Sequence, residues 1–256
     1  MQDCKARILS VRRLAQGYQV LALDAPAIAI QAQPGQFVHV RIPTLAASRL
    51  RRPFSIYDVE PETGRLFILY KVVGFGTRHL AELPEGAEIQ VLGPIGRGFP
   101  LTGSGVPFLV GGGYGVAPLW FLATRLPRKG VLFVGGRTVA DILEVERFQK
   151  LGWVVRVATQ DGSQGVRGLV TVPLDEALAE ESNAVLYACG PDGMLRAVGE
   201  RAIAHGIQGW LSLDKHMVCG VGACLACVQR ICREGTERLA RVCIDGPVFE
   251  SREIVW

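Results

Sequence analysis

Five of the seven cysteines in this chain of 256 residues fall between Cys219 and Cys243. A segment this short cannot bury enough apolar surface to fold by itself, so it needs a disulfide or a metal to hold it. The N-terminal residues are charged and lack the apolar core of a secretory signal, which argues against an oxidising compartment. Because a reducing cytoplasm favours metal binding over disulfides, we expect a metal centre in a cytoplasmic protein.

The spacing of these cysteines indicates which metal centre to expect. Cys219-x4-Cys224-x2-Cys227, followed by Cys243 after fifteen more residues, is the spacing of plant-type [2Fe–2S] ligation. The glycines and alanines between them let the backbone wrap closely, with N–H groups pointing at the sulfurs. Zinc is the alternative, although the spacing is awkward for a tetrahedral zinc site. Cys232 rivals Cys243 as the fourth ligand, but it follows Cys227 too closely to reach a second iron, so we expect a free thiol there.

The rest of the chain divides at a change of periodicity. From Lys5 to about Leu92, short β-rich runs separated by turn residues predict an antiparallel sandwich or barrel. After Pro107, apolar strands alternate with segments of helical spacing, which is typical of βαβ units on a parallel sheet. We therefore predict a β-barrel domain over residues 1–100, an α/β domain over 101–210 and a metal-binding domain over 211–256.

Composition and charge exclude two classes of partner. Apolar residues make up 49% of the chain and charged residues 20%, which is typical of a folded globular protein. The net charge of +4 comes without any run of like charges, so we expect no nucleic-acid partner. Residues 98–124 carry no charge and are long enough to span a bilayer. The glycines and prolines among them break helices, so we expect no membrane partner.

Glycine loops follow two of the predicted strands of the α/β half. One contains Gly111, Gly112, Gly113 and Gly115, and the other runs through residues 189–194. Glycines at a helix N-terminus let a pyrophosphate approach backbone N–H groups, although such a turn can also be purely structural. Because the carboxyl ends of parallel strands share one edge of the sheet, we expect both loops to face one crevice.

The β-rich half contains candidate phosphate-binding residues of its own. Arg52 stands beside a rigid proline and can pair with a phosphate through two hydrogen bonds. Gly76 and Thr77 offer a backbone N–H and a hydroxyl to another phosphate. Taken alone, each string also fits an ordinary strand end or turn, so the order of the motifs along the chain decides their meaning.

Taken in order, these motifs resemble a known family. RPFS, LYK…GFGT, LGPIGRGF, GGGYGVAPL, CGPDGM and CGVGACLAC…CIDGPVF are together similar to the electron-transfer subunit of class 1B dihydroorotate dehydrogenase, a branch of the ferredoxin reductase superfamily. The likeness covers nearly the whole chain. The first four motifs mark the superfamily, whereas the C-terminal cysteine loop and the CIDGPVF ending mark the branch. The resemblance implies a ferredoxin-reductase-like two-domain fold, β-barrel plus α/β, with a small C-terminal [2Fe–2S] domain.

The resemblance also implies roles for individual residues. It assigns FAD binding to the barrel residues Arg52, Pro53, Phe54, Ser55, Leu69, Tyr70, Lys71, Gly76 and Thr77. It assigns NAD binding to the loop residues Gly111, Gly112, Gly113, Gly115, Cys189, Gly190, Pro191 and Asp192. It assigns the [2Fe–2S] cluster to Cys219, Cys224, Cys227 and Cys243.

The implied function is electron transfer. In the family, electrons pass between NAD and a partner through FAD and the cluster, because a flavin can exchange electrons in pairs or singly. The implied partner is an FMN-containing catalytic subunit that oxidises dihydroorotate in pyrimidine (UMP) biosynthesis, with two copies of each subunit. The alternatives are a reductase subunit serving a ferredoxin, hydrogenase or sulfur-reducing partner, and a non-catalytic zinc or cluster module. Arg137, after a predicted strand, either meets the 2′-phosphate of NADP or caps a turn.

Overall fold

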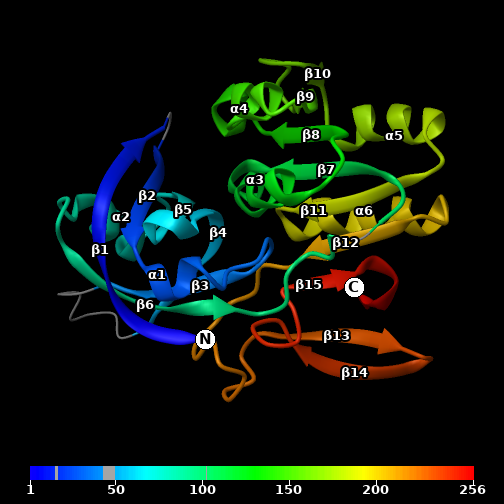
Figure 1. The fold of residues 1–256 in the computed structure, drawn as a ribbon. Helices are drawn as coiled ribbons and strands as arrows, with labels where there is room; N and C mark the ends of the chain where they lie inside the picture. The colour runs from blue at the N-terminus through cyan, green and yellow to red at the C-terminus, as the bar shows by residue number, and fades with distance from the viewer. Residues whose placement is uncertain (15–16, 43–49, 102) are drawn as a thin grey trace.

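The structure is a computed structural model that describes residues 1–14, 17–42, 50–101 and 103–256. Figure 1 shows a β-barrel (blue to cyan) beside an α/β layer (green to yellow), with the C-terminal segment (orange to red) next to both. The Arg97 N–H of the barrel side donates to the Gly246 carbonyl of that segment at 2.5 Å. The predicted fold class, a β-barrel plus an α/β domain, is confirmed.

The barrel is built from strands whose side chains alternate between two faces. It closes in the order β1-β2-β5-β4-β3-β6, and its described strand pairs are antiparallel. Along β3, Val38 and Val40 join the barrel core, so Phe37 and His39 face the opposite side. The elements are β1 Gln2–Arg13, β2 Tyr18–Asp24, α1 Pro26–Ala29, β3 Phe37–Arg41, β4 Arg52–Glu60, η2 Pro61–Thr63, β5 Arg65–Lys71, α2 Phe75–Glu82 and β6 Glu88–Ile95.

The α/β domain has the strand order β10-β9-β8-β7-β11-β12-β15. Its strands are parallel except for β15, which runs antiparallel to β12. The chain order reverses between β7 and β11, and ligands of open α/β sheets bind at such a switch point. The elements are β7 Val106–Gly112, η3 Gly113–Gly115, α3 Val116–Arg125, β8 Val131–Gly136, η4 Val139–Asp141, α4 Val145–Lys150, β9 Val154–Thr159, β10 Val166–Arg167, α5 Thr171–Glu180, β11 Ala184–Cys189, α6 Asp192–Ala204 and β12 Gln208–Ser212.

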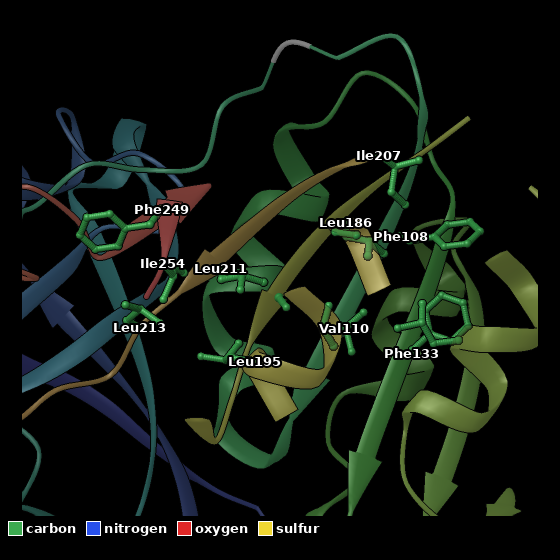
Figure 2. Close-up of a cluster of buried hydrophobic side chains, with 14 of the residues drawn as sticks. Phe108, Val110, Phe133, Leu186, Leu195, Ile207, Leu211, Leu213, Phe249 and Ile254 are labelled. Carbon is green, nitrogen blue, oxygen red and sulfur yellow. The ribbon is translucent and has the colours of Figure 1, made fainter. Parts of the chain in front are cut away.

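The C-terminal segment shares the core of the sheet. Its hairpin consists of β13 Val228–Arg233 and β14 Thr236–Arg241, and it ends with β15 Val248–Glu250 and η5 Ser251–Glu253. Figure 2 shows Phe249 and Ile254 in one buried cluster with Leu211 and Leu213. The segment therefore gains its apolar core from the α/β domain. The domain bounds 1–100, 101–210 and 211–256 stay a prediction. By sequence β15 belongs to the third of these domains, but by position it is a strand of the central sheet.

No helix in the described part of the chain is long and apolar enough to cross a membrane. The uncharged stretch of residues 98–124 contains β7 and most of α3. Within it, Pro107, Gly111 and Gly112 lie in β7, Gly113 and Gly115 in η3, and Pro118 in α3.

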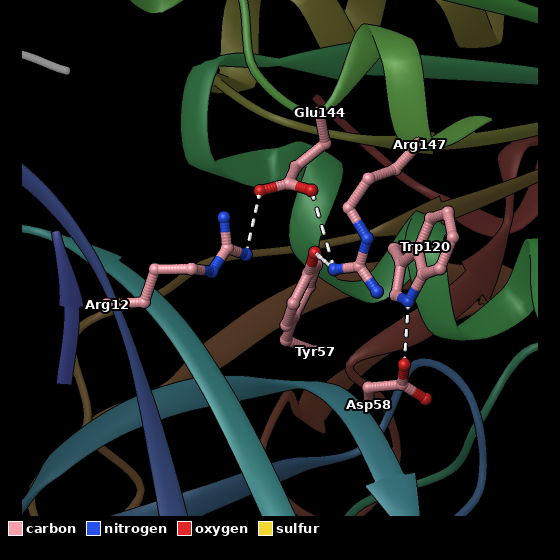
Figure 3. A network of polar contacts seen from close by, with 6 residues as sticks. All are labelled: Arg12, Tyr57, Asp58, Trp120, Glu144 and Arg147. Atoms are coloured by element: carbon pink, nitrogen blue, oxygen red, sulfur yellow. Dashed lines mark hydrogen bonds and ion pairs between the residues drawn. The ribbon is translucent and has the colours of Figure 1, made fainter. Parts of the chain in front are cut away.

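A polar and aromatic network joins the barrel to the α/β domain on one side of their interface. Its members are Arg12, Tyr57 and Asp58 of the barrel and Trp120, Glu144 and Arg147 of the α/β domain (Figure 3). The side chain of Glu144 is only 3% exposed and accepts from Arg12 Nη2 at 3.2 Å and from Arg147 Nη1 at 3.4 Å. Arg147 also donates to the Tyr57 hydroxyl and lies 4.1 Å from the centroid of the Trp120 ring.

This network predicts the effect of removing Arg147. Because Glu144 is buried, Arg147→Met leaves its carboxylate with Arg12 alone, and we expect unfolding to become easier by about 2 kcal/mol. Urea titration of the free energy of unfolding measures this effect. The control is Arg196→Met, which breaks the exposed Arg196–Glu200 pair on α6 and costs less than about 0.5 kcal/mol. Equal costs for the two variants would contradict the prediction.

Candidate functional site

A cavity of about 460 Å³ lies between the barrel and the α/β domain. The ends of β4 and β5 form its barrel side, and the loop after β11 forms its other side. Its walls contain most of the residues predicted to bind FAD, namely Arg52, Pro53, Phe54, Ser55, Leu69, Tyr70, Lys71 and Thr77. They also contain several residues predicted to bind NAD, namely Gly115, Cys189, Gly190, Pro191 and Asp192. The nicotinamide and flavin candidates therefore share one space.

Gly76 lies outside this lining and supports it. A Cβ atom added at Gly76 would lie 2.6 Å from Nε of Arg52. Glycine at this position therefore leaves room for the Arg52 guanidinium. Thr77 fixes the same turn, because its hydroxyl accepts from the N–H of Gly74 at 3.0 Å.

An adjoining cavity of about 660 Å³ opens over the carboxyl ends of the parallel strands. Gly112 and Gly113 line it. It shares Gly190 and Pro191 with the first cavity, which contains the predicted FAD-binding residues and is called the flavin-side cavity below. The two glycine loops therefore face one crevice, as the sequence predicts. Gly111 lies behind this lining, because its missing side chain faces Leu119. Tyr114 of the GGGYGVAPL motif and Arg137, which the sequence analysis singled out, also line it. Further lining residues, which the sequence analysis did not indicate, include Tyr18, Asp141, Gln160, Leu169 and Thr171.

Lys71 and Asp141 form an ion pair where the cavities meet. Lys71 Nζ donates to Asp141 Oδ1 at 2.8 Å, and the Tyr18 hydroxyl donates to the same oxygen at 2.8 Å. Burial acts to raise the pKa of Asp141, but the hydrogen bonds from Lys71 and Tyr18 outweigh it and lower the pKa. The bond to Asp141 raises the pKa of Lys71 in turn. The pair ties β5 of the barrel to η4 of the α/β domain.

The Lys71–Asp141 pair predicts a dependence of stability on pH. The folded-state pKa of Asp141 is below its ordinary value of about 3.9, so the stability it contributes is complete above that pH and is lost as pH falls through the folded pKa. Asp141→Asn should therefore cost about 1–2 kcal/mol of unfolding free energy at neutral pH and progressively less below about pH 4. Denaturant titrations across this range measure the difference. Exposed Glu85→Gln should show no such trend, and a pH-independent cost for Asp141→Asn would refute the assignment.

The four predicted ligand cysteines fall into two pairs. The thiol of Cys219 interacts with that of Cys224, and the thiol of Cys243 interacts with that of Cys227. Cys227 and Cys243 are buried, whereas Cys224 is exposed. No three or more His, Cys, Asp or Glu side chains in the described ranges converge on a single metal ion. Two thiols for each of two irons fit this arrangement, so the donor set suits a [2Fe–2S] cluster better than one zinc ion.

The loop backbone is arranged to stabilise thiolates. Burial acts to raise the pKa of Cys219, but the N–H groups of Val221, Cys224 and Ala223 outweigh it and lower the pKa to about 6. The Val221 N–H lies 3.4 Å from Cys219 Sγ. Gly222 has a φ of +82°, in the left-handed region that favours glycine. This backbone is consistent with the interpretation from the sequence, in which the glycines let the chain wrap closely with N–H groups pointing at the sulfurs.

The remaining cysteines lie away from these pairs. Cys232 is half-buried in β13, where its cross-strand partner in β14 is Glu237. Cys4 pairs with Val91 between β1 and β6, and burial raises its pKa. Cys189 is buried at the end of β11, where burial raises its pKa to about 12. The free thiol expected at Cys232 therefore stays a prediction that the structure favours.

The flavin-side cavity and the cysteine loop share a wall. Met217 and Pro247 line the cavity. Met217 stands two residues before Cys219, and Pro247 stands four residues after Cys243. These two residues connect the lining of the cavity to the two ends of the cysteine-rich segment.

Comparisons with known proteins agree with this geometry. Family models described as an oxidoreductase FAD-binding domain and an oxidoreductase NAD-binding domain match residues 11–99 and 109–200. A model described as the iron-sulfur cluster binding domain of dihydroorotate dehydrogenase B matches residues 214–255. The dihydroorotate dehydrogenase B (NAD(+)) electron transfer subunit of Bacillus caldolyticus is 42% identical over 97% of this chain and 96% of its own length. The chain belongs to the family of dihydroorotate dehydrogenase B electron transfer subunits.

Other members and solved structures extend the comparison. The electron transfer subunit of Desulforamulus reducens is 38% identical over 98% of this chain and 97% of its own length. A chain of the solved NADH-dependent reduced ferredoxin–NADP oxidoreductase is 31% identical, with a TM-score of 0.87 over 98% of this chain and 90% of its own. The ferredoxin reductase of carbazole 1,9a-dioxygenase, at 24% identity and a TM-score of 0.70 over 80% of this chain and 66% of its own, shares the fold. This member of the electron transfer subunit family therefore has FAD-binding, NAD-binding and iron–sulfur domains.

Proposed function

We propose that this chain transfers electrons between NAD(H) and the FMN of a dihydroorotate dehydrogenase catalytic subunit in pyrimidine biosynthesis. The observation that supports this route most directly is that the two cavities share lining residues and that one of them adjoins the cysteine loop. The cavity of the glycine loops shares Gly190 and Pro191 with the flavin-side cavity, whose wall continues through Met217 into the cysteine loop. A flavin in the middle position supplies the necessary chemistry, because it exchanges electrons with nicotinamide in pairs and with a cluster singly.

The chain's own residues would hold and shield each carrier. Arg52 would bind a phosphate of FAD, with Gly76 leaving room for its guanidinium. Gly112, Gly113 and the Pro191 loop would hold the nicotinamide nucleotide at the switch point of the sheet. The Lys71–Asp141 pair would hold the barrel and the α/β domain together beside the two carriers, since Lys71 lines both cavities.

The outer face of the cysteine loop is the proposed contact with the catalytic subunit. Val221 and Leu225 are exposed there, Leu225 by 61%, and Cys224 of the loop is exposed as well. Exposed apolar residues around a redox centre favour a protein partner, because a partner that covers them removes apolar surface from water. The proposed assembly contains two copies of each subunit. No disulfide joins the cysteines in the described residues, which fits the proposed location in a reducing cytoplasm.

Coexpression with the candidate catalytic subunit tests the proposal. The complex should catalyse the oxidation of NADH by orotate, in which orotate, NADH and a proton yield dihydroorotate and NAD⁺. Neither subunit alone should catalyse it. Light scattering of the purified complex measures the stoichiometry. If the complex reduces a ferredoxin with NADH but leaves orotate unchanged, the related reductase function is correct instead, as the 31% identical ferredoxin–NADP oxidoreductase chain would suggest.

A further inference from the structure

His39 is a buried imidazole without a hydrogen-bond partner. It lies in β3, is 0% exposed, and neither of its ring nitrogens makes a well-formed hydrogen bond within the described residues, although backbone groups of Cys219 and Arg51 lie nearby. Buried polar side chains are nearly always hydrogen-bonded, since an unpaired one costs folding free energy. An imidazole left without a well-formed hydrogen bond at this place has donor capacity to offer to a neighbouring group.

The cysteine loop lies directly against this imidazole. A Cβ atom added at Gly220 would lie 2.5 Å from Nδ1 of His39, so only glycine allows the approach. Gly220 also has a φ of +70°, which favours glycine for a second reason. An imidazole ring carries at least one N–H in either protonation state, so His39 has a hydrogen-bond donor to offer.

Two neighbours of His39 line the flavin-side cavity. The cross-strand neighbour of His39 is Pro53 on β4, and Phe37 lies two residues earlier on the same face of β3. Both Pro53 and Phe37 line that cavity. His39 therefore lies between the proposed flavin site and the Cys219–Gly220 turn.

We propose that His39 is a positioning residue of the electron route, which holds the Cys219–Gly220 turn against the barrel and offers its N–H to the sulfur ligands. Hydrogen bonds to the sulfurs are among the factors that set the reduction potential of a cluster, and they raise it by stabilising the extra electron. This inference rests on the proposed function, since it assumes that the loop holds a [2Fe–2S] cluster next to FAD. It adds a residue of the barrel to the determinants of the cluster potential.

The test compares three purified holoproteins with the wild type: His39→Leu, His39→Gln and, as a control, the exposed His205→Leu at the end of α6. Leucine fills the space without a donor, whereas the glutamine amide keeps an N–H. The potential of the cluster is measured by titration with dithionite, following the EPR signal of the reduced form. We expect His39→Leu to lower the ratio of reduced to oxidised cluster at a fixed potential by about tenfold, which is about 59 mV for one electron. His39→Gln and His205→Leu should stay close to the wild type.

Because dithionite reduces the cluster without NADH, this result is independent of whether NADH or orotate is the physiological substrate. Identical potentials in His39→Leu and the wild type would overturn the proposal. If His39→Leu does not retain the cluster, the cluster potential of His39→Gln tests the proposal instead. A cluster with the wild-type potential in His39→Gln supports the donor, and a lowered potential there refutes it. A pulsed EPR coupling to ¹⁵N-labelled histidine that survives in His39→Gln would also refute it.

Discussion

Cys227→Ser is expected to remove the [2Fe–2S] cluster and to stop electron transfer to the catalytic subunit. Cys227 is buried beside Cys243, whose N–H lies 3.4 Å from its sulfur, so a serine hydroxyl cannot replace the thiolate there. Changes in the hydrogen bonds around metal ligands already cost about 10- to 100-fold in affinity or activity, so losing a ligand should reduce orotate-dependent NADH oxidation by more than about a hundredfold. Iron and sulfide analysis of the purified protein and steady-state assays of the complex measure both effects.

Two further measurements make this test specific. Reduction of the bound flavin by NADH in Cys227→Ser should persist, because the nucleotide and flavin cavities lie on the other side of Met217. Cys232→Ser is the matched control, since Cys232 lies in the β13–β14 hairpin outside the cysteine pairs. It should keep its iron and its activity. Loss of iron and sulfide from Cys232→Ser together with an intact cluster in Cys243→Ser would reverse the assignment of the fourth ligand.

Gly115→Ala is expected to damage both the stability of the chain and its affinity for NADH. A Cβ atom at Gly115 would overlap the carbonyl group of Cys189, which is backbone and cannot rotate away. The loop after β11 must therefore shift, and overpacking of this kind costs about 1–3 kcal/mol. Since that loop lines both cavities, we expect the Kd for NADH to rise by more than about tenfold.

Gly193→Ala on the same loop separates this effect from the general cost of losing a glycine. Gly193 is the second residue of α6, and an added Cβ there meets nothing within 4 Å. Alanine should leave the stability unchanged or increase it by up to about 1 kcal/mol, because it restricts the unfolded chain. Thermal unfolding and NADH titration by fluorescence measure the two variants. Similar melting temperatures for Gly115→Ala and the wild type would show that the strand-to-helix turn tolerates a side chain.

The sequence predicts the fold because its local patterns agree with the final packing. In β5, Leu66 and Ile68 enter the barrel core at the period of two that a strand requires. The glycines after β7 and β11 mark the ends of parallel strands, where their function requires them. The exception is β15, which belongs to the cysteine-rich segment by sequence and to the central sheet by position. Only a long-range pairing with β12 places it there, and no local pattern contains that information.

The site was predictable where its residues lie in motifs and not where they meet across domains. Arg52 and the glycine loops carry local signatures. Lys71 and Asp141 are 70 residues apart, and nothing in the local sequence of Asp141 indicates its partner. His39 reads as an ordinary strand residue, and its importance comes from Gly220, which the fold brings against it.

The pairing of β15 with β12 has a consequence for how the protein is made. While the chain is being synthesised, β12 is complete but remains an unprotected edge until β15 has been translated. The cysteine loop and the β13–β14 hairpin lie between these two strands in the sequence, so they leave the ribosome before the sheet edge is covered. Folding of the cysteine-rich segment and protection of the sheet edge are therefore expected to be coupled.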